Sequence, residues 1–296
     1  MKAGFVTIVG RPNVGKSTLL NSIIGEKIAI TSNVSGTTRN IIQGIYNDDN
    51  SQIIFIDTPG VHKPLHKLGS IMNNKVYDTI EQVDVILFVV DSNISFGKGD
   101  KFILDKIKDL NKPIILILNK IDKIKDKKLL LERIDEYNKI YNFNEIIPVS
   151  AVKNDIYDLI KTIKKFLNDQ DRLYDEDFIT LSSTRFLISE LVREKLLNTM
   201  RDEIPHTITC YTEEYKEKKD IINTRVVIVV DRDNLKGMII GKNGKNLKNI
   251  GTCARYDIEK LLNKKVYLET YVKVIKNWRD KEVFLKELGI YEDLWK

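Results

Sequence analysis

The strongest constraint on the fold is one eight-residue stretch that fits the pattern G-x-x-x-x-G-K-[ST], Gly10-Arg11-Pro12-Asn13-Val14-Gly15-Lys16-Ser17. It follows an apolar run at residues 5–9 and precedes a helix-like segment at 18–24, which Gly25 closes. Strand, tight loop and helix are therefore expected in that order. Gly10 and Gly15 let the backbone turn, so that successive N–H groups and the helix N-terminus face one anion. The stretch predicts a loop that holds a polyphosphate.

Two side chains of this loop have expected roles of their own. Lys16 supplies a point charge for the β- and γ-phosphates, and the Ser17 hydroxyl is a hard oxygen ligand of the kind that Mg²⁺ takes. The alternative is a chance match, which ordinary residue frequencies give in roughly one of a hundred chains of this size. The correct flanking segments make that alternative rarer still.

Length and composition favour two soluble domains. A chain of 296 residues is long for one core, and its hydrophobic content of 42% is ample for two. Cys210 and Cys253 match no metal-ligand spacing, so we expect a reducing compartment and two small buried side chains. The longest uncharged apolar run, residues 85–90, is too short to cross a membrane. We expect a cytoplasmic protein, and a peripheral contact with the cytoplasmic face of the cell membrane stays open.

The net charge of +6 is uneven along the chain. Residues 1–180 carry a net charge of +1, residues 181–296 carry +5, and residues 234–276 within the second part carry +7. A local excess of this size attracts polyanions. The alternative is a solvated lysine-rich face in a lysine-rich protein.

Two further segments are expected to reach the phosphates. Residues 31–39 are polar and without periodicity, so we interpret them as a loop in which Thr38, rather than Thr37, completes the Mg²⁺ shell. Residues 52–56 form a buried strand that ends in Asp57-Thr58-Pro59-Gly60. The Asp57 carboxylate would hold a metal-bound water, and the Gly60 N–H would approach the γ-phosphate.

Three more strands carry the expected base-binding residues. Residues 83–91 and 113–118 are continuous apolar runs, as in parallel strands covered on both faces. The second run ends in Asn119-Lys120-Ile121-Asp122, where the Asp122 carboxylate can accept two hydrogen bonds from guanine N1–H and N2–H₂. Adenine presents no such donor pair there. Residues 145–149 lead into Ser150-Ala151-Val152-Lys153, whose backbone would cap guanine O6. In this order the motifs predict a site for GTP and GDP.

The predicted nucleotide site consists of Gly10, Arg11, Pro12, Asn13, Val14, Gly15, Lys16, Ser17, Thr18, Asp57, Thr58, Pro59, Gly60, Val61, Asn119, Lys120, Ile121, Asp122, Ser150, Ala151 and Val152. The predicted catalytic residues are Asn13, Lys16, Thr38, Asp57 and Gly60.

An acidic, polar stretch separates this region from the next. We expect one domain at residues 1–169, a linker at 170–180 and a second domain at 181–296. The second domain begins with a helix over 186–196, which ends before Pro205, and continues with strands at 208–215 and 225–230. A turn with glycines at 241 and 244 follows, then a helix with an apolar face and a last strand at 266–269. Val226, Ile228 and Val230 are expected to share one face of their strand.

The glycine turn carries the basic excess. Two glycines three apart arise often by chance, but this pair follows an apolar turn and has lysines around it. The order of elements resembles a type II KH domain, whose loop clamps the backbone of single-stranded nucleotides. The predicted RNA-binding residues are Ile240, Gly241, Lys242, Asn243, Gly244, Lys245 and Lys248. A helix-turn-helix in which glycine only breaks the chain is the alternative.

Together the motifs of residues 10–17, 37–39, 57–60, 119–122 and 150–153 resemble the translation-factor-related GTPases. The tract from Asp57 to Met72, followed much later by a KH-like region, is similar to the Era family of bacterial GTPases. That resemblance implies an α/β P-loop GTPase domain, with a mostly parallel six-stranded sheet and helices on both faces, followed by an α+β type II KH domain. It also implies a Mg²⁺-dependent GTPase switch that acts in 30S assembly. The KH domain would hold the 3′ end of 16S ribosomal RNA, and the protein would be a monomer that binds no DNA.

The activation of water is left open by the sequence. Val61 stands where many small GTPases carry a water-orienting glutamine, and His62 beside it is one candidate base. The alternative is catalysis by positioning and charge neutralisation, with K⁺ held at Asn13 as it is in the GTPases that the sequence resembles.

Two other functions compete with the switch. A metabolic phosphotransferase is disfavoured because no acceptor-binding arginine cluster is evident and the predicted base is guanine. An RNA-binding module with a purely structural GTP site would show no GTP hydrolysis.

Overall fold

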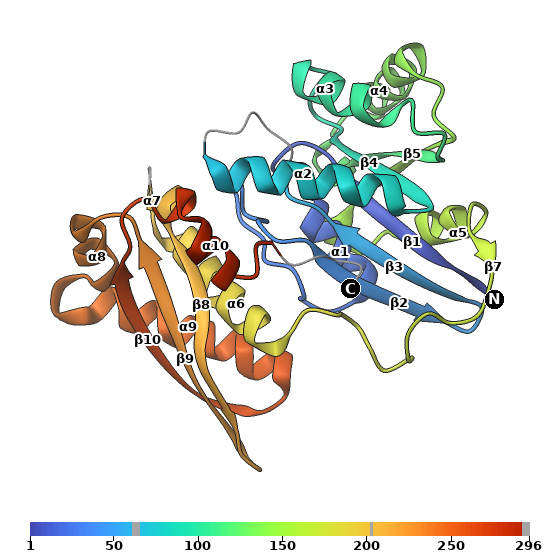
Figure 1. Cartoon of the computed structure of the whole chain (residues 1–296). Coiled ribbons are helices and arrows are strands. Elements are labelled where there is room, and N and C mark those ends of the chain that lie inside the picture. Colours follow the sequence, from blue (N-terminus) through green and yellow to red (C-terminus); the bar gives the residue numbers. More distant parts are fainter. Residues whose placement is uncertain (61–65, 202–203, 292–296) are drawn as a thin grey trace.

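The computed structural model describes residues 1–60, 66–201 and 204–291. It contains two sheets, each with its own helices, connected by an irregular segment near residues 170–183 (Figure 1). Val61 and His62, which the sequence places next to the γ-phosphate, lie outside the described residues.

The first sheet is mostly parallel. Its strands are β1 (Lys2–Val9), β2 (Ile42–Asp48), β3 (Ser51–Asp57), β4 (Val85–Asp91), β5 (Ile114–Asn119) and β6 (Glu145–Val149). Their order is β2-β3-β1-β4-β5-β6, and β2 alone among these six runs antiparallel to its neighbour. The predicted six-stranded sheet is therefore confirmed. A two-residue strand that the sequence did not indicate, β7 (Asn168–Asp169), adds to β1.

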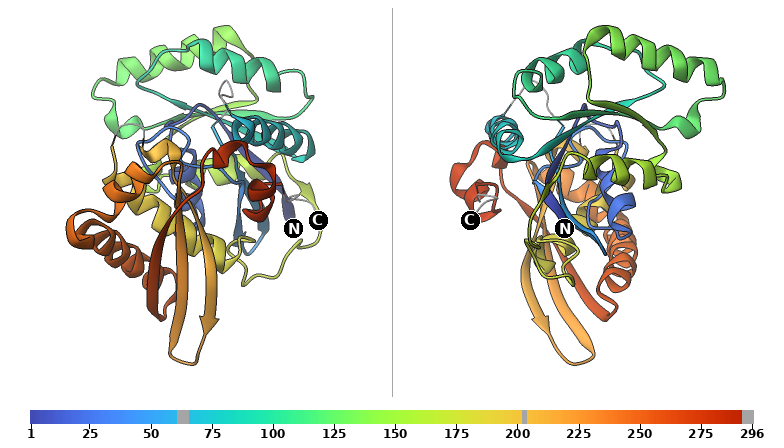
Figure 2. Two further views of the ribbon diagram at one scale, coloured as in Figure 1. Left: turned by 60° about the vertical axis from the view of Figure 1, so that its left-hand side comes forward. Right: turned by 90° about the vertical axis from the view of Figure 1, so that its right-hand side faces the viewer.

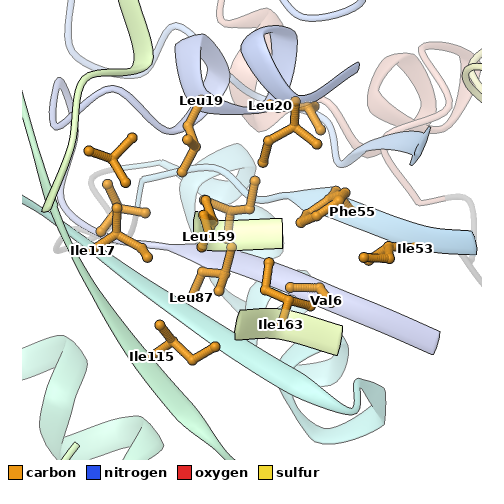
Figure 3. Close-up of a cluster of buried hydrophobic side chains, with 14 of the residues drawn as sticks. Val6, Leu19, Leu20, Ile53, Phe55, Leu87, Ile115, Ile117, Leu159 and Ile163 are labelled. Carbon is orange, nitrogen blue, oxygen red and sulfur yellow. The ribbon is translucent and has the colours of Figure 1, made fainter. Parts of the chain in front are cut away.

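Helices cover both faces of this sheet because its central strands are apolar on both sides. One face packs against α1 (Lys16–Ile24) and α5 (Tyr157–Lys164) through Leu19, Leu20, Leu159 and Ile163, as Figure 3 shows. The other face packs against α2 (Lys67–Gln82), α3 (Lys98–Ile107) and α4 (Lys127–Ile140). The carboxyl ends of the parallel strands meet at one edge, where open α/β sheets bind their ligands.

The segment after β7 runs along the outer edge of the sheet. The Ile45 N–H donates to Ile179 O at 2.9 Å, and Gly44 forms an isolated bridge with Thr180. The side-chain oxygen of Gln52 accepts hydrogen bonds from the N–H groups of Leu173 and Tyr174. The connection therefore covers backbone groups that edge strand β2 would otherwise expose.

The second domain has the order expected from the sequence. It contains α6 (Thr184–Thr199), α7 (Ile204–Thr207), β8 (Thr209–Glu217), β9 (Ile221–Val230), α8 (Asp233–Ile240), α9 (Lys245–Leu262), β10 (Lys265–Val274) and α10 (Glu282–Glu287). The sheet order is β10-β9-β8, with β10 parallel and β8 antiparallel to β9. The short helix α7 around Pro205 was not predicted.

Both faces of this smaller sheet are used. Val226, Ile228 and Val230 face the core formed with α6 and α9, as predicted. Val227 and Val229 form a second cluster with Trp278 and Phe284 on the opposite face. In the right-hand view of Figure 2 the strands stand between α10 on one side and α9 on the other.

Two expectations about composition can be compared with the structure. Cys210 is buried in the second domain, but Cys253 lies exposed on α9, so the prediction that both cysteines are buried is wrong for Cys253. On the helix Cys253 lies about 100° around the axis from the adjacent Ala254, and so outside the buried stripe of Ile250, Ala254 and Ile258. Among the described residues, no helix is long and apolar enough to span a membrane.

Candidate nucleotide site and RNA-binding loop

The phosphate-binding loop lies between β1 and α1 at the carboxyl edge of the large sheet. Gly15 caps α1 with φ 99°, and a Cβ there would lie 2.4 Å from Nδ2 of Asn119. A Cβ at Gly10 would lie 2.3 Å from the carbonyl oxygen of Val89. Both glycines are therefore required because the loop passes close to neighbouring strands.

Lys16 is held inside this loop. Its exposed fraction is 6%, and its Nζ donates to the carbonyl oxygens of Gly10 and Arg11, each at 3.1 Å. Burial lowers the pKa of the Lys16 ammonium, and the nearby Asp57 carboxylate opposes that shift. The two backbone carbonyls hold the ammonium inside the loop, at the position from which it is expected to donate hydrogen bonds to a phosphate.

The three predicted Mg²⁺ ligands meet although they come from three segments. Ser17 Oγ lies 2.8 Å from Thr38 Oγ1 and donates to Asp57 Oδ2 at 2.6 Å. Thr38 makes this contact, whereas the Thr37 hydroxyl bonds within its own loop. Burial raises the pKa of Asp57 to about 6, against the opposing effects of Lys16, Ser17 and Thr38.

This cluster fits a magnesium ion. Asp57 Oδ1 is buried and has no hydrogen-bond partner among the described residues, so it has room to accept a bond from a metal-bound water. Two hydroxyls and one carboxylate are hard oxygen donors, and few protein ligands suffice because Mg²⁺ keeps several waters. No group of three or more His, Cys, Asp or Glu side chains in the described part of the chain could hold a metal ion.

The predicted base-binding residues meet at the ends of β5 and β6. Asn119 donates from Nδ2 to Val14 O at 2.9 Å and accepts from the Lys120 and Ala151 N–H groups. Lys120 Nζ reaches Asn13 O at 2.5 Å and Asp91 Oδ2 at 2.8 Å. Asn119 and Lys120 thus connect the base-binding segments to the phosphate loop.

The carboxylate that is predicted to bind guanine is oriented by the neighbouring segment. Ser150 Oγ donates to Asp122 Oδ1 at 2.7 Å, which fixes one carboxylate oxygen at the start of a short 3-10 helix (Ile121–Lys123). Ala151 is buried and Val152 is 72% exposed, so their side chains face in different directions. Because Ser150 binds Oδ1, the second carboxylate oxygen of Asp122 is left to accept a hydrogen bond from a base.

Some predicted residues have side chains that point elsewhere. Arg11 Nε donates to the buried Asp100 of α3 at 2.7 Å, and Thr58 Oγ1 donates to Ile8 O at 2.9 Å. These two side chains stabilise the loop and the end of β3. Contacts with nucleotide at these positions would come from the backbone.

The loop over residues 31–38 folds onto the phosphate loop. Asn13 Nδ2 donates to Asn33 O at 2.9 Å. The cavity lined by Lys16, Ser17, Thr18, Thr38 and Gly60, together with residues 30–32, has a volume of about 60 Å³. Asn119, Asp122 and Ser150 do not line this cavity, so it represents only the phosphate and metal part of the predicted nucleotide site.

The glycine turn of the second domain connects α8 to α9 and is exposed. Gly241, Asn243 and Gly244 have φ values of 71°, 52° and 73°. Lys242, Asn243, Lys245 and Lys248 are exposed, and none of these lysines forms an ion pair with a described residue. Ile240 is partly buried beneath the turn. The turn therefore presents backbone and ammonium groups to solvent, which suits a sugar-phosphate chain.

Comparison with known proteins identifies both domains. Residues 5–120 match the family model described as a 50S ribosome-binding GTPase, and residues 203–279 match the KH domain model. A structure of Aquifex aeolicus Era bound to GDP·AlF4⁻ is 43% identical, with a TM-score of 0.95 and coverage of 98% of this chain and 99% of that chain. A structure of Era with MgGDPNP and nucleotides 1506–1542 of 16S ribosomal RNA is also 43% identical, with a TM-score of 0.94 and the same coverage.

The chain belongs to the Era family. It is a GTPase with a C-terminal KH domain, as its motifs predicted. The similarity covers both domains and nearly the whole length of both chains.

The sequence did not reveal how this Era-family chain joins its two domains. Consecutive residues of α6 contact the loop over 31–38: Arg193 donates from Nη2 to Thr37 O, and Glu194 Oε1 accepts from the Thr31 N–H at 2.9 Å. Arg193 is also paired with Glu190 at 2.6 Å. Glu194 binds Lys27 at 2.5 Å.

The N-terminal end of α2 also contacts the KH domain. The Lys67 N–H donates to Asp280 Oδ1 at 2.9 Å, and Lys67 Nζ pairs with Glu282. Leu68 and Met72 of α2 pack with Trp278 and Phe284 in one apolar cluster. The residues that form these contacts between the domains belong to no recognisable sequence motif. The contacts therefore become visible only in the folded structure.

Proposed function

We propose that this protein is a GTP-hydrolysing switch that binds the 3′ end of small-subunit ribosomal RNA through its KH domain and acts in 30S subunit assembly. One observation carries the proposal: the loop over residues 31–38, which lines the predicted phosphate site, and the N-terminal end of α2 both contact the KH domain. The Era structure in complex with a 16S RNA fragment supports this choice of RNA.

The decisive test of RNA binding targets the exposed glycine turn. Lys242→Asp/Asn243→Asp should lower the affinity for an RNA matching nucleotides 1506–1542 of 16S RNA at least about tenfold and reduce its salt slope by about 1. Lys219→Asp/Asn263→Asp makes the same charge change at exposed sites away from the turn and should leave affinity nearly unchanged. Equal losses in the two variants would contradict a role for the turn, and GDP affinity should stay constant in both.

Coupling between the sites follows from the contacts of α6. The loop over residues 31–38 carries the predicted Mg²⁺ ligand Thr38 and is bonded to Arg193 and Glu194, so a rearrangement of this loop between nucleotide states would alter those bonds. RNA affinity should therefore differ between GDP and a non-hydrolysable GTP analogue, by a factor in the range of about 5–150. By linkage, RNA should change the affinity for the analogue, relative to GDP, by the same factor. Equal RNA affinity in both states would exclude the coupling.

Hydrolysis is proposed to depend on Mg²⁺ held by Ser17 and Thr38 directly and by Asp57 through water. When bound, the ion neutralises charge that develops on the transferred phosphoryl group. Lys16 stabilises the same charge from the loop side, and the Gly60 N–H orients the γ-phosphate. A phosphotransferase would instead need an added acceptor for turnover, which measurement of GTP hydrolysis in water alone would test.

Besides Mg²⁺ and Lys16, we propose that a K⁺ ion held at Asn13 neutralises negative charge on the phosphates during hydrolysis. This residue lies in the phosphate loop, is exposed and has φ 64°. Hydrolysis should then be faster in K⁺ than in Na⁺, and Asn13→Ala should remove the difference while GDP affinity changes little. Equal rates in both salts would exclude the ion, and loss of turnover in His62→Ala alone would favour a histidine base.

The place of action proposed is the cytoplasm, where the 30S precursor is assembled, with the protein acting as a monomer. Fractionation of cells into soluble, ribosomal and membrane pools would test this. Recovery of the protein mainly with membranes would contradict it.

A further inference from the structure

A cavity of about 790 Å³ lies between the two domains, and neither the GTPase motifs nor the glycine turn forms any part of it. Its walls include Gln43 of β2 and Leu68 of α2 in the first domain, Leu181 of the connecting segment, and Phe186 of α6 and Trp278 in the KH domain. In Figure 1, α6 and α10 lie on the side of the KH domain that faces the first domain. Small-molecule sites usually measure about 300–1,000 Å³, so an organic molecule fits this cavity.

The charges of the walls favour an anion. The wall carries two carboxylates, Glu190 and Glu287, against four basic side chains, Arg39, Lys75, Arg185 and Arg193. Glu190 is already paired with Arg193, at 2.6 Å. Arg39 and Arg185 form no ion pair with any residue that the structure describes. Positive charge therefore remains for a bound molecule to balance.

Arg39 is held between the domains without a carboxylate. Its Nη1 donates to Ile208 O, and its guanidinium carbon lies 5.5 Å from the centroid of the Trp278 ring. Burial lowers the pKa of the Arg39 guanidinium to about 9, and the nearby charges of Arg193 and Arg279 act in the same direction. An anion beside Arg39 would oppose both effects, because it stabilises the charged form.

Two further donor groups belong to residues of the same wall. Arg193 Nη1 and Gln43 Nε2 are buried and have no hydrogen-bond partner among the described residues. Arg193 as a whole is 0% exposed and Gln43 is 8% exposed. A buried donor left without an acceptor is costly, and such groups are rare in native proteins. A molecule with acceptor oxygens would satisfy them.

Apolar side chains accompany these polar groups. Ile41, Phe186 and Tyr211 are partly buried in the wall, and Leu68 and Trp278 are buried there. An inorganic ion gains nothing from such side chains, whereas the hydrocarbon part of an organic molecule does. Apolar walls with a few convergent polar groups are typical of small-molecule sites.

We propose that this inter-domain cavity binds a small organic anion, whose phosphate or carboxylate group is held by Arg39, Arg193 and Gln43 and whose hydrocarbon part packs beside Phe186 and Tyr211. Because its walls come from both domains and from the connecting segment, the bound molecule stabilises this arrangement of the domains. The anion is thus an effector of the switch and not its substrate.

Water is the competing occupant, because ordered waters can also satisfy buried donors in a polar cavity. Water does not balance the charge of Arg39, and it gains nothing from the apolar part of the wall. Binding of an organic anion at this place distinguishes the two.

The experiment uses the full-length protein saturated with Mg²⁺ and a non-hydrolysable GTP analogue, so that the phosphate loop is blocked. Hexyl phosphate, hexanoate, inorganic phosphate and the neutral hexan-1-ol are titrated by calorimetry. The tighter of the two organic anions identifies the charged group, and it should bind at least about tenfold more tightly than hexan-1-ol. Inorganic phosphate should bind more weakly than hexyl phosphate, because it lacks the hydrocarbon part.

Trp278 reports where the anion binds. The chain has two tryptophans, so Trp295→Phe leaves Trp278 as the only one. Addition of the tighter organic anion to this variant should change the Trp278 emission, with the same midpoint that calorimetry gives. An unchanged emission would overturn the proposal, as would equal affinity for hexan-1-ol and both organic anions.

Two wall variants test the polar contacts. Arg39→Gln should weaken binding of the anion at least about tenfold and leave hexan-1-ol unchanged. Gln43→Met keeps the approximate volume of the side chain and removes its donor, so it should weaken the anion about 3- to 10-fold and keeps the test valid if Arg39→Gln is poorly folded. Arg133→Gln is the matched control, because Arg133 is a partly buried arginine of α4 outside the cavity. Wild-type affinity in both wall variants would overturn the proposal.

The role as an effector is tested separately. Arg193 of the wall also donates to Thr37 O in the loop over residues 31–38, so the anion should bind with different affinity when GDP replaces the analogue. This part rests on the coupling proposed above, whereas binding itself does not. Equal affinity in the two nucleotide states would overturn the effector role, and none of these measurements depends on RNA.

Discussion

The phosphate loop and the glycine turn of the KH domain both need glycines with positive φ in close contact with neighbouring atoms, but the fold encloses the two loops to different degrees. In the phosphate loop, glycines permit close packing: a Cβ at Gly15 would meet Asn119, and Lys16 is buried and bonded to carbonyl oxygens. In the KH turn, Gly241 and Gly244 give positive φ values, and the lysines around them are exposed without ion-pair partners among the described residues. One loop is enclosed by the fold, and the other protrudes from it.

This difference indicates how each loop binds. The phosphate loop is pre-organised by neighbouring strands, so its ligand is held in one geometry and a small displacement is costly. The KH turn is fixed only by its own backbone and by Asn246, which donates to Met238 O at 3.2 Å. RNA binding by the KH turn should therefore depend more on the charge and the exposure of the turn than nucleotide binding by the phosphate loop does. Substitutions in the phosphate loop should therefore have larger effects.

The largest effect is expected for Gly15→Ala, compared with Gly25→Ala. Both glycines have positive φ and cap the two ends of α1, but a Cβ at Gly25 has nothing within 4 Å. Each substitution costs about 1–2 kcal/mol of backbone strain, and only that at Gly15 also displaces Asn119. Gly15→Ala should lower GDP affinity more than about 100-fold, whereas Gly25→Ala should change stability alone. Equal GDP affinities by fluorescence titration would contradict the role of close packing.

A smaller effect is expected for Asp57→Asn, which keeps the shape of the side chain and removes its charge. Because Asp57 is expected to hold the ion through a water, the loss should lower Mg²⁺ affinity about 10- to 100-fold. The Mg²⁺ concentration that half-saturates GTP hydrolysis should rise accordingly, while GDP binding without Mg²⁺ stays close to wild type. Asp91→Asn is unsuitable as a control, since Asp91 pairs with Lys120 of the base site. Asp84→Asn at the opposite end of β4, where the carboxylate accepts from the Phe5 N–H, should leave the Mg²⁺ dependence unchanged.

In the KH turn, Gly241→Ala should reduce RNA affinity about tenfold. Gly241 has φ 71° and ψ 175°, a region almost restricted to glycine, and a Cβ there would lie 2.7 Å from the Asn246 Cβ. The turn must therefore rearrange, and its N–H groups would no longer face the sugar-phosphate backbone of the RNA. GTP hydrolysis without RNA should not change. A loss of GTP hydrolysis in the same variant would show that the two loops are less independent than their separation indicates.

The sequence predicted best what depends on local chemistry. Ser17, Thr38 and Asp57 were placed around one ion from motif order alone, and the structure brings them within hydrogen-bonding distance. This succeeds because parallel strands deliver their carboxyl ends to one edge. The six-stranded sheet and the order of elements in the KH domain followed from apolar periodicity in the same way.

What the sequence could not predict depends on the packing of distant segments. Nothing in the pattern of α6 shows that Arg193 and Glu194 bond to the loop over residues 31–38. Val227 and Val229 continue an apolar strand, but the cover supplied by Trp278 could not be inferred from periodicity. Nor does the sequence show that the Arg11 side chain pairs with Asp100, since only the fold brings α3 near the loop.

The smallest effect is expected at a glycine that neither loop requires. Gly237 lies exposed inside α8 with an ordinary helical φ, and a Cβ there would meet nothing within 4 Å. Glycine inside a helix costs about 0.5–1 kcal/mol relative to alanine, so Gly237→Ala should raise the free energy of unfolding by that amount. RNA affinity should stay at the wild-type level, because the backbone of the turn begins four residues later, and denaturant unfolding together with RNA titration measures both quantities. If RNA affinity falls in Gly237→Ala, the bound RNA passes over the exposed side of α8 at Gly237, and the binding surface extends from the turn along that helix.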